Sequence, residues 1–269
     1  MADEPGLTRR PTMLARLVTH EYFLLREPGP LEIVIARSAG GPGSPLLALG
    51  RFPLPATAET AAALAAANGA DRRARAKKYL HLADRCRCLA AGALVRAVAG
   101  ADPLADRDGR PYFPESPDRR VTIAHSGPWA ACAFHDGPVG IDVEDLAMPA
   151  EPGMAAAFMS PAELSAYDAL DGALARQAYF FDVWTAKEAF IKAVGGPVRF
   201  APESLTVNTE PGLNIRRETL PGGFRLALVW KDRRSVSSGI PASRTPADER
   251  GASGRPMRDC GPFPRETSF

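Results

Sequence analysis

The order of secondary-structure signals along this chain repeats once, and that repeat constrains the fold more than any single motif. Strand signals, a long helical pattern and further strand signals precede Gly137, and the same order follows it. Strand signals are short apolar or β-branched runs, and helical signals are longer runs of helix-forming residues. The sequence therefore predicts an α+β protein with two similar halves.

The first half is expected to begin with strands and continue as helices. Leu31–Arg37 is rich in β-branched residues and is predicted as a buried strand, and Leu46–Arg51 as a second strand. The alanine-rich stretch Thr57–Asn68 favours a helix. One continuous helix is expected over Asp71–Ala99, because Gly100 follows as a C-terminal stop. Two further strands are expected at residues 121–124 and 130–134.

The second half opens with a predicted strand, Val139–Glu144. Ser160, followed by Pro161 and by Glu163, predicts a helix start in which the serine caps the helix and the glutamate closes a capping box. A long helix is expected over Ala173–Val194, before a Gly-Gly-Pro stop. The remaining strands are expected near Leu205–Asn208, Asn214–Arg217 and Phe224–Trp230.

Composition excludes several classes of protein. The 269 residues are 45% hydrophobic and 24% charged, which is typical of globular proteins and excludes collagen, wholesale disorder and disulfide miniproteins. A net charge of +2 does not favour nucleic-acid binding. Cys86 and Cys88 lie two apart in a predicted helix and point apart, so they cannot share a metal. A reducing, cytoplasmic location is expected.

The two ends of the chain give weaker signals. Asp3 and Glu4 stand where a signal peptide would be basic, and no run of eighteen apolar residues predicts a membrane span. Pro, Gly and Ser supply 15 of the 35 residues from Ser235 to Phe269. We expect this segment to be a disordered tail, because it has few large apolar residues to bury.

Two carboxylates on one strand face form the first candidate site. Asp142 and Glu144 alternate with Ile141 and Val143, so the acidic pair shares one face while the apolar pair faces the core. Such a pair suits a hard divalent cation such as Mg²⁺. A polar outer face on a half-buried strand is the alternative, and for this tripeptide alone it is favoured.

A helix, a loop and a basic segment are the other candidates. Glu188 and Lys192 are four residues apart on one helix face. They form either an ordinary surface ion pair or part of a site that binds a metal and a phosphate. His125, at a strand end beside a flexible turn, can reach a phosphate, although a lone histidine is more often structural. The basic run over residues 72–87 indicates either a solvated helix face or a phosphate site.

Taken together, these motifs resemble the phosphopantetheinyl transferase family, in its larger type that activates surfactin synthetase and similar assembly lines. The resemblance rests on the order and spacing of Ala124–Gly127, Val139–Glu144 and Trp184–Lys192, with support from Asp84–Arg96 and Gly109–Pro111. It implies two α/β halves related by a pseudo-twofold, with coenzyme A bound between them. The implied boundaries are residues 1–137 and 138–234, followed by the tail 235–269.

The resemblance also implies a reaction and its metal. Phosphopantetheine passes from coenzyme A to a serine of an acyl or peptidyl carrier protein, and adenosine 3′,5′-bisphosphate leaves. Asp142, Glu144 and Glu188 match the acidic positions that bind Mg²⁺, which holds the pyrophosphate. Glu188 is also the expected base for the carrier serine, and Lys192 matches a lysine on the pyrophosphate.

Other positions match coenzyme A contacts. His125, with Ser126 in the same loop, is expected at the phosphates, and Arg87 at the 3′-phosphate. Gly109, Arg110 and Pro111 are expected to line the adenine pocket. Two departures are Leu82, where some relatives carry a lysine for the 3′-phosphate, and Ala124, where a serine is frequent.

Two rival functions stay open at this point. A non-catalytic module that binds coenzyme A or a carrier protein would have the same fold, but it would not need the three carboxylates. A Mg²⁺-dependent transferase acting on another diphosphate is the more distant rival. The expected protein is a monomer with no nucleic-acid or membrane partner, and its carrier protein is not specified by the sequence.

Overall fold

The computed structural model describes residues 22–24, 31–37, 43–106, 108–150, 153–195 and 201–232. Its helices are α1 (Ala58–Ala66), α2 (Ala70–Ala76), α3 (Leu82–Ala99), α4 (Met154–Phe158), α5 (Pro161–Asp168) and α6 (Ala173–Val194). Its strands are β1 (Tyr22–Leu24), β2 (Glu32–Arg37), β3 (Leu46–Arg51), β4 (Leu104–Ala105), β5 (Pro111–Tyr112), β6 (Arg120–Ser126), β7 (Trp129–His135), β8 (Val139–Asp145), β9 (Leu213–Leu220) and β10 (Phe224–Lys231).

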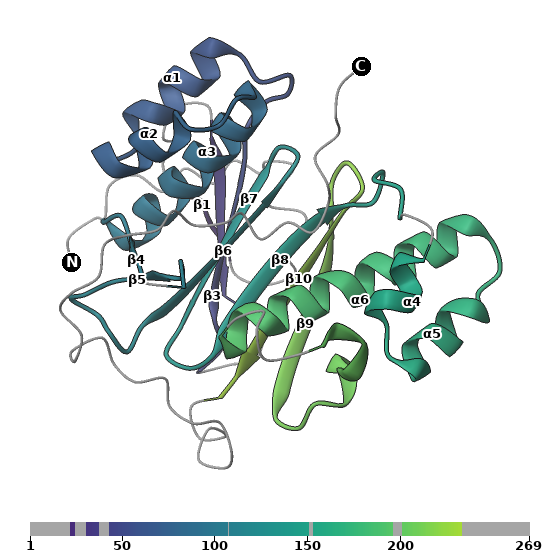
Figure 1. The fold of residues 1–269 in the computed structure, drawn as a ribbon. Coiled ribbons are helices and arrows are strands. Elements are labelled where there is room, and N and C mark those ends of the chain that lie inside the picture. The colour runs from purple at the N-terminus through teal and green to yellow at the C-terminus, as the bar shows by residue number, and fades with distance from the viewer. Residues whose placement is uncertain are drawn as a thin grey trace.

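Two antiparallel sheets carry the fold (Figure 1). One has the order β1-β2-β3-β7-β6, and the other has the order β8-β10-β9. Their edge strands β6 and β8 lie side by side, and the backbone N–H of Ile141 donates to the hydroxyl of Thr122 at 3.3 Å. The mixed α/β class expected from the sequence is confirmed.

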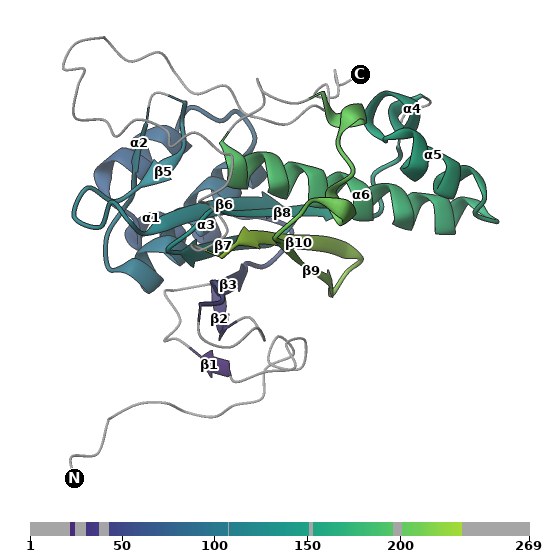
Figure 2. The ribbon, with the colours of Figure 1, turned by 90° about the horizontal axis from the view of Figure 1, so that it is seen from below.

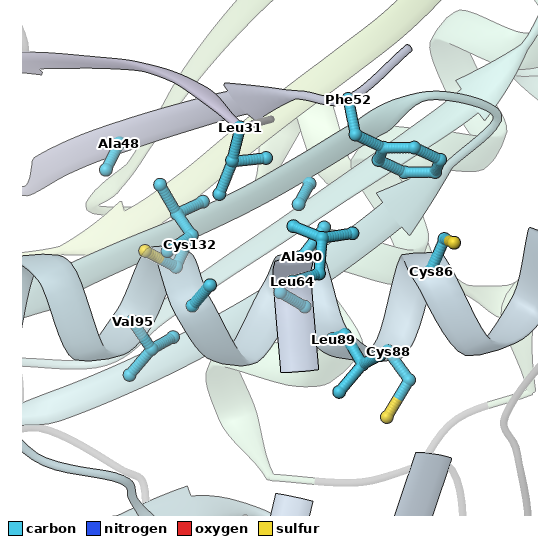
Figure 3. Packing of buried hydrophobic residues seen from close by; sticks show 14 of the residues in the cluster. Leu31, Ala48, Phe52, Leu64, Cys86, Cys88, Leu89, Ala90, Val95 and Cys132 are labelled. Atoms are coloured by element: carbon cyan, nitrogen blue, oxygen red, sulfur yellow. The ribbon is translucent and has the colours of Figure 1, made fainter. Parts of the chain in front are cut away.

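Helices α1 to α3 cover one face of the larger sheet. The buried face of α3 runs from Cys86 to Val95 and packs with Leu64 of α1 and with Phe52 and Cys132 near the sheet (Figure 3). In the same view, Cys86 and Cys88 point away from each other on α3, as the helical spacing predicts.

The prediction of one helix over residues 71–99 is wrong. The chain leaves the helix between α2 and α3, and His81 has extended backbone angles before α3 begins. Helix α2 instead folds back against α3, which buries Ala76 and leaves Leu80 83% exposed. Propensity favoured one helix, but tertiary packing overrides propensity when two short helices bury more apolar surface.

The two sheets pack against each other through apolar side chains. Ile141 and Val143 of β8 lie with Leu226 and Leu228 of β10 in the same cluster as residues of β3 and β7. Asp142 is buried whereas Glu144 is partly exposed, so the interpretation of this pair as a polar outer face is wrong for Asp142.

Helix α6 covers the other face of the smaller sheet (Figure 2). Ala186, Ala189 and Phe190 pack against Ala227 and Val229 of β10. Gly140 allows the close approach of the helix to β8, because a Cβ there would collide with the carbonyl oxygen of Ala189. The helix ends as predicted, with Gly195 in the left-handed conformation at φ 107°.

Helices α4 and α5 pack beside α6 and form a small lobe. Ser160 caps α5, and Glu163 closes the capping box, as predicted. The strand predicted at Leu205–Asn208 is wrong: residues 207–209 form a 3-10 turn, and Val207 packs beneath α6. Leu205 and Val207 are both buried in the apolar cluster beneath α6, so the apolar alternation that favoured a strand here anchors a turn to the helix.

Several expectations concern residues outside the described ranges, including the tail 235–269 and most of the first thirty residues. Strand β10 is the last described element and confirms the strand predicted at Phe224–Trp230. In the described part of the chain, no helix is long and apolar enough to cross a membrane.

Candidate active site

The site candidates on β8 and α6 meet because the helix runs antiparallel to the strand. Gly140 lies under Ala189 and Ala193, and Asp142 pairs with Lys192, farther along β8. Near the end of β8, Glu144 interacts with Trp184 and Glu188. The structure therefore brings Asp142, Glu144, Glu188 and Lys192 together, although Glu144 and Glu188 are 44 positions apart in the sequence.

Lys192 is the cation at the centre of this group. Its Nζ donates to Oδ1 of Asp142 at 2.7 Å and to the carbonyl oxygen of Ile141 at 3.1 Å. Oδ2 of Asp142 is buried and has no hydrogen-bond partner in the described structure. Since Lys192 binds across to β8, the simple surface ion pair with Glu188 does not describe its position.

Burial and mutual repulsion shift the carboxyl groups toward their protonated forms. Burial, with the charge of Asp142 next, raises the pKa of Glu144 to about 8, against the opposing effects of Lys192 and Trp184. Burial and then Asp142 raise the pKa of Glu188 to about 7. Burial also raises the pKa of Asp142, which Lys192 opposes. The pKa of Lys192 is raised because three carboxylates outweigh its burial.

Trp184 and Lys187 attach this part of α6 to the α4–α5 lobe. The Trp184 ring stacks on Phe158 with centroids 4.1 Å apart. The Nζ of Lys187 is fully buried, pairs with Glu163 at 2.6 Å and donates to the carbonyl oxygens of Phe158 and Pro202. Glu188 follows Lys187 directly, so these contacts fix the helix segment that carries it.

His125 and Ser126 were expected in a loop but are the last residues of β6, and they lie at the Glu144 end of the group. Thr122 meets Ile141 near the middle of both edge strands, and Gly127 lies against the ring of Phe224. Phe224 is the cross-strand partner of Asp145, so β6 and β8 end together. His125 is exposed and Ser126 is partly exposed.

The Gly109–Pro111 segment lies at the opposite end of α6. Gly109 turns the chain at φ 81°, and Pro111 begins β5. The guanidinium of Arg110 lies so close to Gly195 that a Cβ there would be 2.9 Å from Nη1. A cation at this position complements the free carbonyls of the helix C-terminus.

Arg87 lies on α3, where it pairs with Asp84 one turn earlier. Its side chain is about one quarter exposed. Arg87 therefore lies on a different element from the carboxylate group of β8 and α6.

Comparison with known proteins establishes the family. A model of the 4′-phosphopantetheinyl transferase superfamily matches residues 138–237, which include β8, α6 and β10. A 4′-phosphopantetheinyl transferase of Bacillus subtilis is 32% identical over 173 residues, which are 61% of this chain and 76% of that relative. The chain belongs to the 4′-phosphopantetheinyl transferase family.

Other relatives agree with this membership. The transferase Sfp of Bacillus subtilis strain 168 is 32% identical over 146 residues, which are 51% of this chain and 64% of Sfp. HetI of Nostoc sp. strain PCC 7120 is 28% identical over 199 residues, which are 68% of this chain and 83% of HetI. The chain therefore spans slightly less than two thirds of Sfp. The family predicted from three short motifs is confirmed.

Two ion pairs that lie next to the site and hold α6 against its neighbours were not predicted from the sequence. Lys187 shares a face of α6 with the buried residues Trp184 and Ile191, and its pairing with Glu163 was not expected. The ion pair between Asp182 and Arg225 was also missed. A charged residue inside an otherwise apolar helix face is the signal that could have indicated the first pair.

Proposed function

We propose that this family member transfers the 4′-phosphopantetheine group of coenzyme A to a serine of an acyl or peptidyl carrier protein. The observation that carries the proposal is the convergence of α6 on β8, which holds Glu188 and Lys192 against Asp142 and Glu144. Relatives named 4′-phosphopantetheinyl transferases support it.

A divalent cation, Mg²⁺, belongs to the proposal. In the described residues, no three His, Cys, Asp or Glu side chains are already arranged as metal ligands. The donor chemistry still fits a hard cation, because three carboxylates converge and Asp142 keeps a buried oxygen without a partner. Asp142, Glu144 and Glu188 would hold the ion. When bound, it offsets the charge of the pyrophosphate.

Glu188 would take the proton from the carrier serine, directly or through a water. A carboxylate with a pKa of about 7 is well matched to general-base work near neutral pH. The freed serine oxygen forms a bond to the phosphorus that carries the pantetheine arm. The bond from that phosphorus to the bridging pyrophosphate oxygen breaks, and adenosine 3′,5′-bisphosphate leaves with the electron pair.

Lys192 would stabilise the charge that develops on the pyrophosphate oxygens. Its ammonium already lies among three carboxylates, and their charge keeps it protonated. Because its side chain is partly exposed, it can move from Asp142 toward a bound phosphate without crossing the core. A preorganised cation of this kind acts most strongly where the site excludes water.

Coenzyme A would bind between the two halves, which the proposal relates by a pseudo-twofold, with residues 1–137 and 138–234 each supplying contacts. His125 and Ser126 would meet the phosphates, and their position beside the Glu144 end of β8 supports this. Arg87 would bind the 3′-phosphate. The turn of Gly109, Arg110 and Pro111 would line the adenine.

The proposal also includes a monomer that works in the cytoplasm without a nucleic-acid or membrane partner. The nearly balanced charge supports the absence of a nucleic-acid partner. The free thiols of Cys86, Cys88 and Cys132 support a reducing compartment.

The test is the mass of a carrier protein after incubation. Purified apo-carriers of the fatty-acid, polyketide and peptide types are incubated with coenzyme A, the protein and either Mg²⁺ or excess chelator. We expect phosphopantetheine on a serine of at least one carrier, only with Mg²⁺. Binding of coenzyme A without any transfer in the whole panel would instead favour a non-catalytic binding module.

A further inference from the structure

Arg225 lies directly across the sheet from Glu144. In the antiparallel register of β8 and β10, these two residues are paired, so their side chains share the face beneath α6. Opposite charges in this relationship normally attract each other across the strands. An arginine is therefore poised to bind one of the three proposed metal ligands.

The guanidinium of Arg225 nevertheless contacts Asp182 and Thr219 instead of Glu144. Nε of Arg225 lies 2.7 Å from Oδ1 of Asp182 on α6, and Nη2 donates to Oδ2 at 3.4 Å. Nη1 donates to the hydroxyl of Thr219, which is the partner of Arg225 on β9. Asp182 and Thr219 thus hold the guanidinium over the β9 side of the sheet, away from β8.

We propose that Asp182 is a positioning residue that keeps Arg225 from pairing with Glu144 and so preserves the affinity of the carboxylate group for a divalent cation. This inference rests on the proposed function, because it takes Glu144 as a metal ligand. Asp182 itself is about one and two-thirds turns before Glu188 on α6 and lies next to the site, not in it.

Removal of the Asp182 charge changes which carboxylate is available to Arg225. Thr219 offers only a neutral hydroxyl, whereas Glu144 offers a charged and directly opposite partner once it is ionised. An arginine can bind a carboxylate with two parallel hydrogen bonds, and this occupies the oxygens that a cation needs. A competing ion pair of ordinary strength weakens cation binding by about three- to tenfold.

A second arginine provides a matched control. Burial raises the pKa of Asp182, and the charge of Arg217 also opposes this rise. The guanidinium of Arg217 donates to Asn208. Its cross-strand partner on β10, however, is Ala227. Asp182→Asn removes one negative charge, and replacing either arginine removes one positive charge, so both double variants have the net charge of the unmodified protein. Only the removal of Arg225 also removes the competitor for Glu144, so the two double variants separate positioning from a general effect of charge.

The experiment titrates Mn²⁺ into the metal-free protein of 269 residues and follows the free ion by electron paramagnetic resonance. Mn²⁺ accepts the same oxygen ligands as Mg²⁺. We expect Asp182→Asn to raise the Kd about three- to tenfold, and Asp182→Asn/Arg225→Met to return it to within about twofold of the unmodified protein. Asp182→Asn/Arg217→Met should stay weak. Asp182→Ser replaces Asp182→Asn if that variant does not fold.

Two results overturn the inference alone: an unchanged Kd for the Asp182 variant, or equal rescue by Arg217→Met and Arg225→Met. Glu144→Gln serves as the reference for the proposed function. If it binds Mn²⁺ as tightly as the unmodified protein, or if the unmodified protein binds none, the metal assignment itself is wrong and the inference falls with it.

Discussion

Nζ of Lys192 lies 2.7 Å from Oδ1 of Asp142 and joins the last turns of α6 to the middle of β8. The carboxylate of Asp142 is almost fully buried, so Lys192 provides the charge that makes its ionised form tolerable there. This contact connects the stability of the protein to the chemistry proposed for the site.

Lys192→Met should therefore destabilise the metal-free protein. We expect the free energy of unfolding at pH 8 to fall by about 1–3 kcal/mol, a value below that of a fully buried pair because Lys192 is partly exposed. Urea denaturation with chelator present measures it. The double variant Lys192→Met/Asp142→Asn should recover most of the loss, and additive losses would show that the two groups do not depend on each other.

Gly140→Ala should separate α6 from β8. The new methyl group would overlap the backbone of Ala189, which cannot move as a side chain can, so we expect a loss of more than about 2 kcal/mol in stability. Gly50→Ala on β3 is the matched control, because its nearest neighbour is the flexible side chain of Leu31 at 3.1 Å. Equal melting temperatures for the two variants would contradict the close packing.

The stability of the metal-free protein should fall as pH rises from about 4.5 to 8. The pKa values of Glu188 and Glu144 are raised to about 7 and about 8 by folding, so the folded state holds more protons than the unfolded state over this range. The contribution is present below the unfolded pKa of about 4.3 and is lost as pH passes the folded values.

Thermal unfolding with chelator, from pH 5 to 9, measures this dependence. The difference in melting temperature between the unmodified protein and Glu144→Gln/Glu188→Gln isolates the effect of the two groups. The stability of the variant relative to the unmodified protein should increase toward pH 9. Parallel curves for the two proteins would show that these carboxyl groups titrate normally.

Arg87 should determine how the protein distinguishes coenzyme A from its dephospho form. Loss of one charge-assisted contact costs about 1.5–3 kcal/mol, or roughly ten- to a hundredfold in affinity. Calorimetry should show that Arg87→Ala lowers the affinity for coenzyme A by this factor and the affinity for dephospho-coenzyme A by much less. Arg85→Ala, two residues earlier, is the control. Similar losses of affinity for both ligands would show that Arg87 does not bind the 3′-phosphate.

The sequence predicted the elements of the site better than their environment. The strand Val139–Glu144 and the helix Ala173–Val194 have local signals, alternation in the first and a glycine stop in the second, and both were found. The break before Leu82 was missed, since it depends on how α2 packs back on α3.

The contacts between distant elements left no local signal. Alternation placed Asp142 and Glu144 on one face but could not show that α6 covers that face. The pairing of Arg225 with Asp182 depends on strand register and on the path of the helix, which no short window of sequence contains. Only the resemblance of the separate motifs to one family indicated that they would meet.

The most direct measurement of the central claim is the transfer rate of Glu188→Gln. The variant keeps the size of the side chain but cannot take a proton, and loss of a general base lowers a rate by about 10²-fold or more. Glu203→Gln, an exposed glutamate of the neighbouring turn, is the control. Carrier mass is followed over time with coenzyme A and Mg²⁺, and coenzyme A affinity is measured separately. The account predicts a rate loss of at least about 10² with affinity changed far less, and normal transfer by the control. Transfer by Glu188→Gln at the rate of the unmodified protein would contradict it.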